Sequence, residues 1–289
     1  MISEYIRLIR VHHWIKNLFV FVPLIFAKLL FEVEYVVQVL LAFLAFSIVS
    51  SMVYVVNDLF DIESDKLHPK KKFRPLASGK ISKDKANVVV GILAVLFILA
   101  MQMFNWQFNV VLISYVVLNI LYTLMLKNIV IIDIISIGAG FMLRVIGGAY
   151  VIDVYVSNWL ILTALFISLF LAVMKRRAEI AIVMNENDTR KVLQDYSLGF
   201  IDQIATISSG AVIICYALYS VSDRAIEAFN TDKLIFTVIF VIFGIFRYMY
   251  LVHKKSHGES SIEIMISDLP MLLNILFYFI TITLIIYFI

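Results

Sequence analysis

The chain has 289 residues, of which 62% are apolar and 16% charged, and its mean hydropathy is +0.97. This composition excludes an ordinary soluble globular domain and indicates a polytopic membrane protein. The formal net charge is only +3, and no basic patch typical of nucleic-acid readers stands out, so we expect no nucleic-acid partner. No linker or change of composition divides the sequence, and we expect one polytopic membrane domain over residues 1–289.

Apolar runs long enough, or nearly so, to cross a hydrocarbon core of about 30 Å follow one another along the chain. They lie at residues 18–33, 36–56, 87–104, 108–126, 130–151, 157–174, 201–221, 233–252 and 270–289. The first run is short and contains Pro23 and Lys28. The sequence therefore predicts an all-α integral membrane protein with about nine transmembrane helices.

Basic residues separate strongly between the two sides that this topology defines. The side opposite the amino terminus holds only Lys28, Arg224 and Lys233, and nearly all other Lys and Arg residues fall on the amino-terminal side. By the positive-inside rule, the amino-terminal side faces the cytoplasm. We expect an inner, cytoplasmic membrane of a bacterium, with the polar loops after the second and sixth runs on its cytoplasmic face.

Four acidic residues and an asparagine end the second apolar run, in the string Asn57-Asp58-Leu59-Phe60-Asp61-Ile62-Glu63-Ser64-Asp65. On a helix, Asn57 or Asp58 shares a face with Asp61 and Asp65. Carboxylates beside a membrane are costly unless a cation neutralises them, and a divalent metal that holds a phosphorylated substrate is a common solution. We predict Asn57, Asp58 and Asp61 as catalytic Mg²⁺ ligands and Asp65 as a substrate-binding residue. The alternative is an ordinary solvated loop.

Two further polar stretches supply candidate phosphate ligands. Lys70 and Arg74 follow the acidic string directly, although basic loops also arise from the positive-inside rule alone. After the sixth run, Glu179 and Asp188 are predicted to complete the metal site, Glu179 as a direct ligand. The neighbouring candidates for substrate binding are Lys175, Arg176, Lys191 and Tyr196. The alternative for Lys175 and Glu179 is a helical ion pair, because they are four residues apart.

Arg144 lies deep in the fifth run, where an arginine needs an ion partner, a polar cavity or a phosphate. Asp133, about three helical turns away, is a candidate partner. Tyr122 and Lys127 are predicted to reach the same pocket, although Tyr122 also fits an interfacial aromatic belt. Lys16 and Asn17 are predicted to contact ligand at the first membrane entry. The glycines near Arg144 indicate close helix packing: Gly138, Gly140, Gly147 and Gly148.

The acidic string, followed by Arg74-Pro75-Leu76-Ala77-Ser78-Gly79, resembles the first acidic motif of the UbiA superfamily of intramembrane prenyltransferases. The resemblance covers nearly the full chain in its span layout. It implies nine helices around a central cavity, acidic loops that bind Mg²⁺ and a diphosphate, and a lateral opening for a long lipid. Most members carry a second Asp-rich motif, D-x-x-x-D, after the sixth span, and this chain has no such pair between Lys175 and Asp202.

Other strings are similar to the decaprenyl-phosphate phosphoribosyltransferase branch of that superfamily. They are Lys-Arg-Arg-Ala-Glu from Lys175, Arg-Lys-Val-Leu-Gln-Asp-Tyr-Ser from Arg190, His-Trp-Ile-Lys-Asn from His13, Leu-Arg-Val-Ile-Gly-Gly from Leu143 and Phe-Arg-Tyr from Phe246. This similarity implies transfer of phosphoribose from phosphoribosyl pyrophosphate to a polyprenyl phosphate, with Mg²⁺ as cofactor and pyrophosphate as leaving group. Two alternatives stay open, a prenyl transfer from a prenyl diphosphate to an aromatic or other lipophilic acceptor, and a transporter of phosphorylated metabolites. A homo-oligomer is compatible with the sequence.

Overall fold

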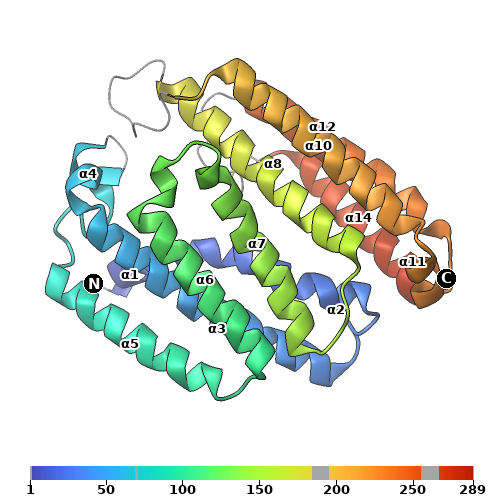
Figure 1. Ribbon diagram of the computed structural model, residues 1–289, viewed down its shortest axis with the longest axis horizontal. Coiled ribbons are helices and arrows are strands. Elements are labelled where there is room, and N and C mark those ends of the chain that lie inside the picture. Colours follow the sequence, from blue (N-terminus) through green and yellow to red (C-terminus); the bar gives the residue numbers. More distant parts are fainter. Residues whose placement is uncertain (1, 69–70, 184–194, 255–266, 289) are drawn as a thin grey trace. The chain divides into compact units, whose positions relative to one another are not determined.

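A computed structural model describes residues 2–68, 71–183, 195–254 and 267–288, and every regular element in these ranges is helical (Figure 1). These ranges contain eight helices that are long and apolar enough to cross a membrane. A ninth candidate is the amino-terminal pair Ile2–Leu8 and Val11–Phe26, which is bent by 46°. The predictions of an all-α membrane protein and of about nine spans are confirmed.

The long helices match eight of the nine predicted runs to within a few residues, apart from longer ends at α3 and α8. They are α3 (Val33–Phe60), α5 (Lys83–Met101), α6 (Trp106–Leu124), α7 (Ile132–Val151), α8 (Asn158–Val183), α10 (Leu198–Ser220), α12 (Val238–Lys254) and α14 (Leu269–Phe288). The shorter elements are α1 (Ile2–Leu8), η1 (Val11–Phe21), α2 (Val22–Phe26), α4 (Ile62–Leu67), η2 (Lys71–Phe73), η3 (Leu126–Asn128), α11 (Asp223–Phe229) and η4 (Lys233–Thr237).

The first predicted span, 18–33, is wrong in its limits. In the structure this region is covered by η1 and α2, which extend from Val11 to Phe26 and form the second part of the bent amino-terminal pair. Pro23 is the second residue of α2 and lies in the first turn of that helix, where the fixed φ of proline is tolerated. Lys28 adopts a positive φ of 63°, which continues no helix, and α3 begins only at Val33.

The chain forms two compact units, each with its own core. Unit 1 comprises Met1–Ile25, Leu29–Lys127 and Leu143–Tyr155, and unit 2 comprises Phe26–Lys28, Asn128–Met142 and Val156–Ile289. In unit 1 the buried side chains of Phe46, Phe108 and Leu112 join α3 to α6. In unit 2 Phe170 and Tyr248 join α8 to α12 through their rings, whose centroids are 5.7 Å apart. The expectation of a single domain stays a prediction.

Gly138, Gly147 and Gly148 of α7 are closely packed, as the sequence predicts. A Cβ atom on Gly148 would lie 2.0 Å from the backbone carbonyl oxygen of Val20, and one on Gly147 would lie 2.8 Å from the ring of Phe46. On Gly138 it would meet Leu169 at 2.8 Å. The absence of a side chain at Gly148 therefore lets η1 approach α7 within unit 1, which places Asn17 beside Arg144.

Candidate functional site

The acidic motif lies in unit 1, where α3 passes into α4 (Figure 1). Asp61 stands at the break between the two helices. Helical hydrogen bonds continue across this break, because the Asp61 amide donates to the Asn57 carbonyl at 3.0 Å and the Asp65 amide donates to the Asp61 carbonyl at 2.8 Å. The local backbone therefore keeps the helical spacing on which the sequence prediction depends, and the acids meet in one cluster.

Each of the three aspartates in this cluster contacts a cation. Arg10 donates from Nη2 to Oδ1 of Asp58. Nη1 of Arg74 bridges two carboxylates, at 3.2 Å from Oδ1 of Asp58 and 2.5 Å from Oδ2 of Asp65. Lys127 donates from Nζ to Oδ1 of Asp61 at 2.6 Å. The structure thus brings Arg74 to the acids and adds Arg10, and it pairs Lys127, which the sequence assigned to the pocket of Arg144, with Asp61. We refer to these six residues as the acid–base cluster.

Asn57 is fixed by two side chains. Its Nδ2 donates to Oδ2 of Asp61 at 3.0 Å, and its Oδ1 accepts from the Thr123 hydroxyl at 3.1 Å. The oxygen that would bind a metal therefore already accepts a hydrogen bond from α6. Thr123 carries no sequence signal of its own, because a threonine in an apolar run is common.

The acid–base cluster fits a divalent metal in the chemistry of its donors, because its carboxylate oxygens, like the neighbouring amide oxygen of Asn57, are hard ligands. Asp58 and Asp65 are buried, with 2% and 5% of their surface exposed, so their charges need a counter-ion. Within the described residues, no group of three or more His, Cys, Asp and Glu side chains lies in a geometry that could hold a metal. The carboxylates of the acid–base cluster do not converge on one point, because they are paired with Arg10, Arg74 and Lys127.

A second polar cluster of unit 1 surrounds Arg144, which is 4% exposed. Arg144 donates from Nε to Oδ1 of Asn17 at 2.7 Å and from Nη2 to the Tyr115 hydroxyl at 2.8 Å. Nδ2 of Asn17 donates in turn to the hydroxyl of Ser47 at 3.0 Å. Lys16, the neighbour of Asn17, lies close enough to Arg144 and Arg10 to be affected by their charges. The structure thus brings together Lys16, Asn17 and Arg144, which were separate candidates in the sequence, and Tyr115 joins them.

Asp133 does not have the role expected from the sequence. Its Oδ2 accepts from Nε of Arg176 at 2.7 Å, and its Oδ1 accepts from the Tyr196 hydroxyl at 2.7 Å, both within unit 2. The candidate pair with Arg144 is therefore replaced by a pair with Arg176. The spacing along α7 does not reveal these partners, because they come from α8 and from the residues before α10.

Arg176 also donates from Nη1 to Oε2 of Glu179, and it is buried, with 1% exposed. Oε1 of Glu179 lies 3.8 Å from Nζ of Lys175, the helical pair that the sequence left as an alternative. Tyr196 accepts from the backbone amide of Ile131 at 2.6 Å. Burial raises the pKa of the Tyr196 phenol, which keeps its proton for the bond to Asp133. Arg176 and Tyr196 thus stand as structural partners of Asp133.

The remaining predicted residues are placed as follows. Tyr122 is half-buried near the end of α6. Lys70, Asp188 and Lys191 lie outside the described residues. Glu179 belongs to unit 2 and the acid–base cluster to unit 1, so the prediction that Glu179 shares a metal with Asp58 and Asp61 stays a prediction.

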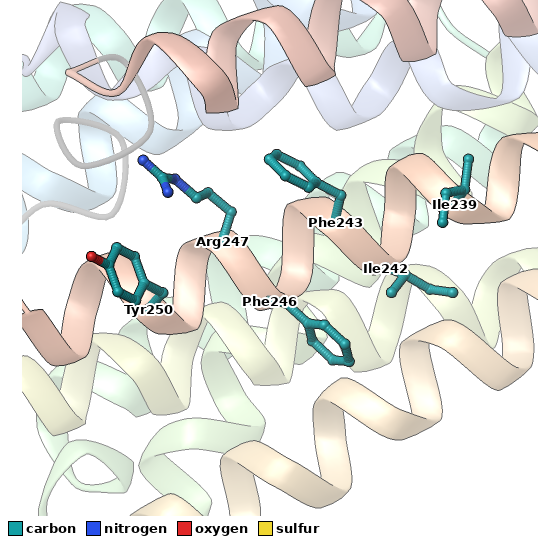
Figure 2. Close-up of a pocket in the computed structure, with 6 residues that line it drawn as sticks. All are labelled: Ile239, Ile242, Phe243, Phe246, Arg247 and Tyr250. Carbon is teal, nitrogen blue, oxygen red and sulfur yellow. The ribbon is translucent and has the colours of Figure 1, made fainter.

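Unit 2 also has a groove of about 330 Å³ along α12. Its lining is apolar at Ile239, Ile242, Phe243 and Phe246 and polar at one end, and Figure 2 shows Phe243 and Arg247 pointing in the same direction from the helix. Arg247 donates to both oxygens of Asp268, at 3.0 and 2.8 Å. Asp268 also accepts from the Met271 amide at 3.0 Å and so caps α14, which gives this pair a structural role.

Residues 19–287 match the model of the UbiA prenyltransferase family. The chain belongs to this family. Among curated relatives, the decaprenyl-phosphate phosphoribosyltransferase of Mycolicibacterium smegmatis is 31% identical over 279 residues, which cover 93% of this chain and 87% of the relative. A protein of the same name from Corynebacterium glutamicum is 31% identical over 275 residues, covering 91% and 80% of the two chains.

The fold of this UbiA family member is also that of a solved structure. A UbiA homologue from Archaeoglobus fulgidus, described as bound to GPP and Mg²⁺, superposes with a TM-score of 0.72 at 16% identity and covers 98% of this chain and 99% of its own. The predicted superfamily is therefore confirmed, and membership in a family of transferases replaces the transporter alternative.

Proposed function

We propose that this protein transfers 5-phosphoribose from phosphoribosyl pyrophosphate to a polyprenyl phosphate and releases pyrophosphate. The observation that carries the proposal is the similarity, across almost the whole of both chains, to relatives named decaprenyl-phosphate phosphoribosyltransferase. The geometry supports it, because carboxylates and cations meet in one cluster, and a substrate with several phosphates needs both.

The reaction breaks the bond between the ribosyl C1 carbon and the diphosphate oxygen, and it forms a bond from C1 to an oxygen of the lipid phosphate. Charge develops on the leaving diphosphate, and Arg74 and Lys127 are positioned beside the acids to hold its oxygens. The lipid phosphate is already an anion, so the attack requires no strong general base.

We further propose a divalent metal, Mg²⁺, as cofactor. Asp58 and Asp61 would hold it, with Asn57 as a third oxygen donor, and Asp65 would bind substrate. A bound divalent ion stabilises negative charge on a departing diphosphate. The A. fulgidus homologue bound to GPP and Mg²⁺ supports this assignment, as do the oxygen donors of the acid–base cluster.

We propose that the polar cluster around Arg144 binds a substrate phosphate group other than the leaving diphosphate. Lys16 has no hydrogen-bond partner among the described residues, and it lies near two arginines, Arg10 and Arg144. Cations gathered in this way repel one another unless an anion lies between them. We also propose four residues from unit 2. Glu179 and Asp188 would be further metal ligands, and Lys175 and Lys191 would contact phosphate. Arg176 and Tyr196 would act by positioning Glu179 and Asp133.

The charge separation in the sequence supports an inner bacterial membrane with the site on the cytoplasmic face. The two curated relatives named above, from Mycolicibacterium smegmatis and Corynebacterium glutamicum, are bacterial proteins. In a Cys215→Ala background, single cysteines at Asp84 and Glu227 should react with an impermeant thiol reagent from opposite sides of oriented vesicles. Labelling of both cysteines from one side would contradict the nine-span topology. A homo-oligomer stays a prediction.

A prenyl transfer from a prenyl diphosphate is the second candidate, since the solved neighbour is described with GPP. Two parallel transfer assays, one for each donor and its acceptor, distinguish the two reactions. Purified protein receives labelled phosphoribosyl pyrophosphate with a polyprenyl phosphate, and in parallel a prenyl diphosphate with an aromatic acceptor. We expect a lipid product heavier by one phosphoribosyl group. Transfer from the prenyl diphosphate, with no phosphoribosyl product, would overturn the proposal.

A further inference from the structure

Arg10 is the cation in the acid–base cluster that the sequence did not indicate. It follows α1 with a positive φ of 52°, and its guanidinium contacts Oδ1 of Asp58, the oxygen that Arg74 also reaches. The side chain of Arg10 is 13% exposed and that of Asp58 is 3% exposed. Two guanidinium groups therefore share one buried carboxylate oxygen that the proposed function assigns to a metal.

The charges of the acid–base cluster balance. Three carboxylates, those of Asp58, Asp61 and Asp65, face three cations, those of Arg10, Arg74 and Lys127. A metal ion that entered alone would have to displace cations from buried carboxylates and would leave those cations without partners, which is costly. A diphosphate that entered alone would meet carboxylates of its own sign. A metal and a diphosphate that enter together satisfy both sets.

Resting on the proposed function, we infer that Arg10 is a further diphosphate-binding residue. Arg10, Arg74 and Lys127 leave their carboxylates for phosphate oxygens when the metal and the diphosphate bind together. A guanidinium group can bind phosphate oxygens in the same bidentate way in which it binds carboxylate oxygens. Each cation therefore exchanges one anionic partner for another and keeps an ion pair. The ring centroid of Tyr54 lies 5.0 Å from the Arg10 guanidinium and gives it a neutral neighbour that both arrangements can retain.

The exchange makes metal and diphosphate binding cooperative, and thermal unfolding of the purified full chain measures this. The probes are Mg²⁺ alone, pyrophosphate alone with EDTA, and both together. We expect the pair to raise the unfolding temperature by about 5 °C more than the sum of the separate shifts, since ligands that bind only the folded state raise stability. The inference would be overturned if Mg²⁺ alone raised the unfolding temperature as much as Mg²⁺ and pyrophosphate together, or if the two separate shifts were strictly additive.

Variants of Arg10 test which partner it has in the loaded site. In Arg10→Met, the cluster loses one positive charge, so the shift caused by Mg²⁺ alone should grow. The affinity for pyrophosphate in the presence of Mg²⁺ should fall about tenfold, because one phosphate donor is gone. If Arg10 instead stayed on Asp58, the variant would bind pyrophosphate as the wild type does, and the inference would be wrong.

Arg7→Met is the matched control, because Arg7 lies three residues earlier in the chain, is half-exposed and pairs with Glu4. It should leave both ligand responses unchanged. If Arg10→Met does not fold, Arg10→Lys keeps the charge beside Asp58 and removes the guanidinium fork. Arg10→Lys should then show normal unfolding without ligand and weaker pyrophosphate binding with Mg²⁺; unchanged pyrophosphate binding would overturn the inference.

Pyrophosphate is the leaving group of both candidate donors, so these measurements do not depend on which donor is used. Cooperative binding without phosphoribosyl transfer would refute the proposed function alone. Phosphoribosyl transfer with additive binding would refute the exchange alone.

Discussion

The ammonium Nζ of Lys127 lies 2.6 Å from Oδ1 of Asp61, which joins the segment after α6 to the end of α3. Both side chains are mostly buried, at 14% and 16% exposed. Lys127→Met should therefore leave a poorly solvated carboxylate and reduce stability by about 1–3 kcal/mol, together with a loss of transferase activity. Thermal unfolding and the transfer assay measure the two effects.

Lys66→Met is the control for this variant, because Lys66 pairs with Glu63 at 3.0 Å but both side chains are exposed, at 49% and 78%. An exposed pair contributes little, so stability and activity should stay near wild type. Equal losses in the two variants would show that burial of the Asp61 pair has no special importance.

Asp58 is a buried member of the acidic motif and Glu63 an exposed neighbour. Asp58→Asn should lower turnover by roughly two orders of magnitude or more, because the proposed metal loses an anionic ligand. Glu63→Gln should retain activity. The transfer assay, with unfolding curves to confirm the fold, measures this; an active, folded Asp58→Asn protein would remove the acidic motif from catalysis.

Asp133 is completely buried and accepts from both Arg176 and Tyr196. Asp133→Asn should destabilise the protein by roughly 3 kcal/mol, because Arg176 keeps a buried charge with one carboxylate fewer. Asp202→Asn is the matched control, since Asp202 pairs with Arg177 at 2.6 Å but is 41% exposed. Similar unfolding temperatures for the two variants would contradict a structural role for Asp133.

Gly148→Ala should destabilise the protein by about 1–3 kcal/mol, because the new methyl group would overlap the backbone carbonyl of Val20 and the helices would have to separate. Gly91, in α5, has open space where a Cβ would stand, so Gly91→Ala should cause no loss. Unfolding temperatures measure both. A stable Gly148→Ala protein would show that η1 and α7 can separate at little cost.

The sequence by itself determined the helical membrane fold, eight of the spans and the position of the acidic motif. Hydropathy and spacing are properties of neighbouring residues, so a run such as 36–56 or a string such as Asn57 to Asp65 is legible without the fold. The first span was misplaced, because its structured part includes a polar 3-10 segment that no apolar run reveals.

Only the tertiary structure decided which charges meet. Arg10 and Asp58 are 48 residues apart, Lys127 and Asp61 are 66 apart, and Arg176 and Asp133 are 43 apart. No local pattern specifies such pairs, because each depends on how two helices pack and on which side chain can reach a buried carboxylate. The sequence supplied a surplus of candidate cations, and packing within each unit selected Arg10, Arg74 and Lys127 for the acidic motif and Arg176 for Asp133.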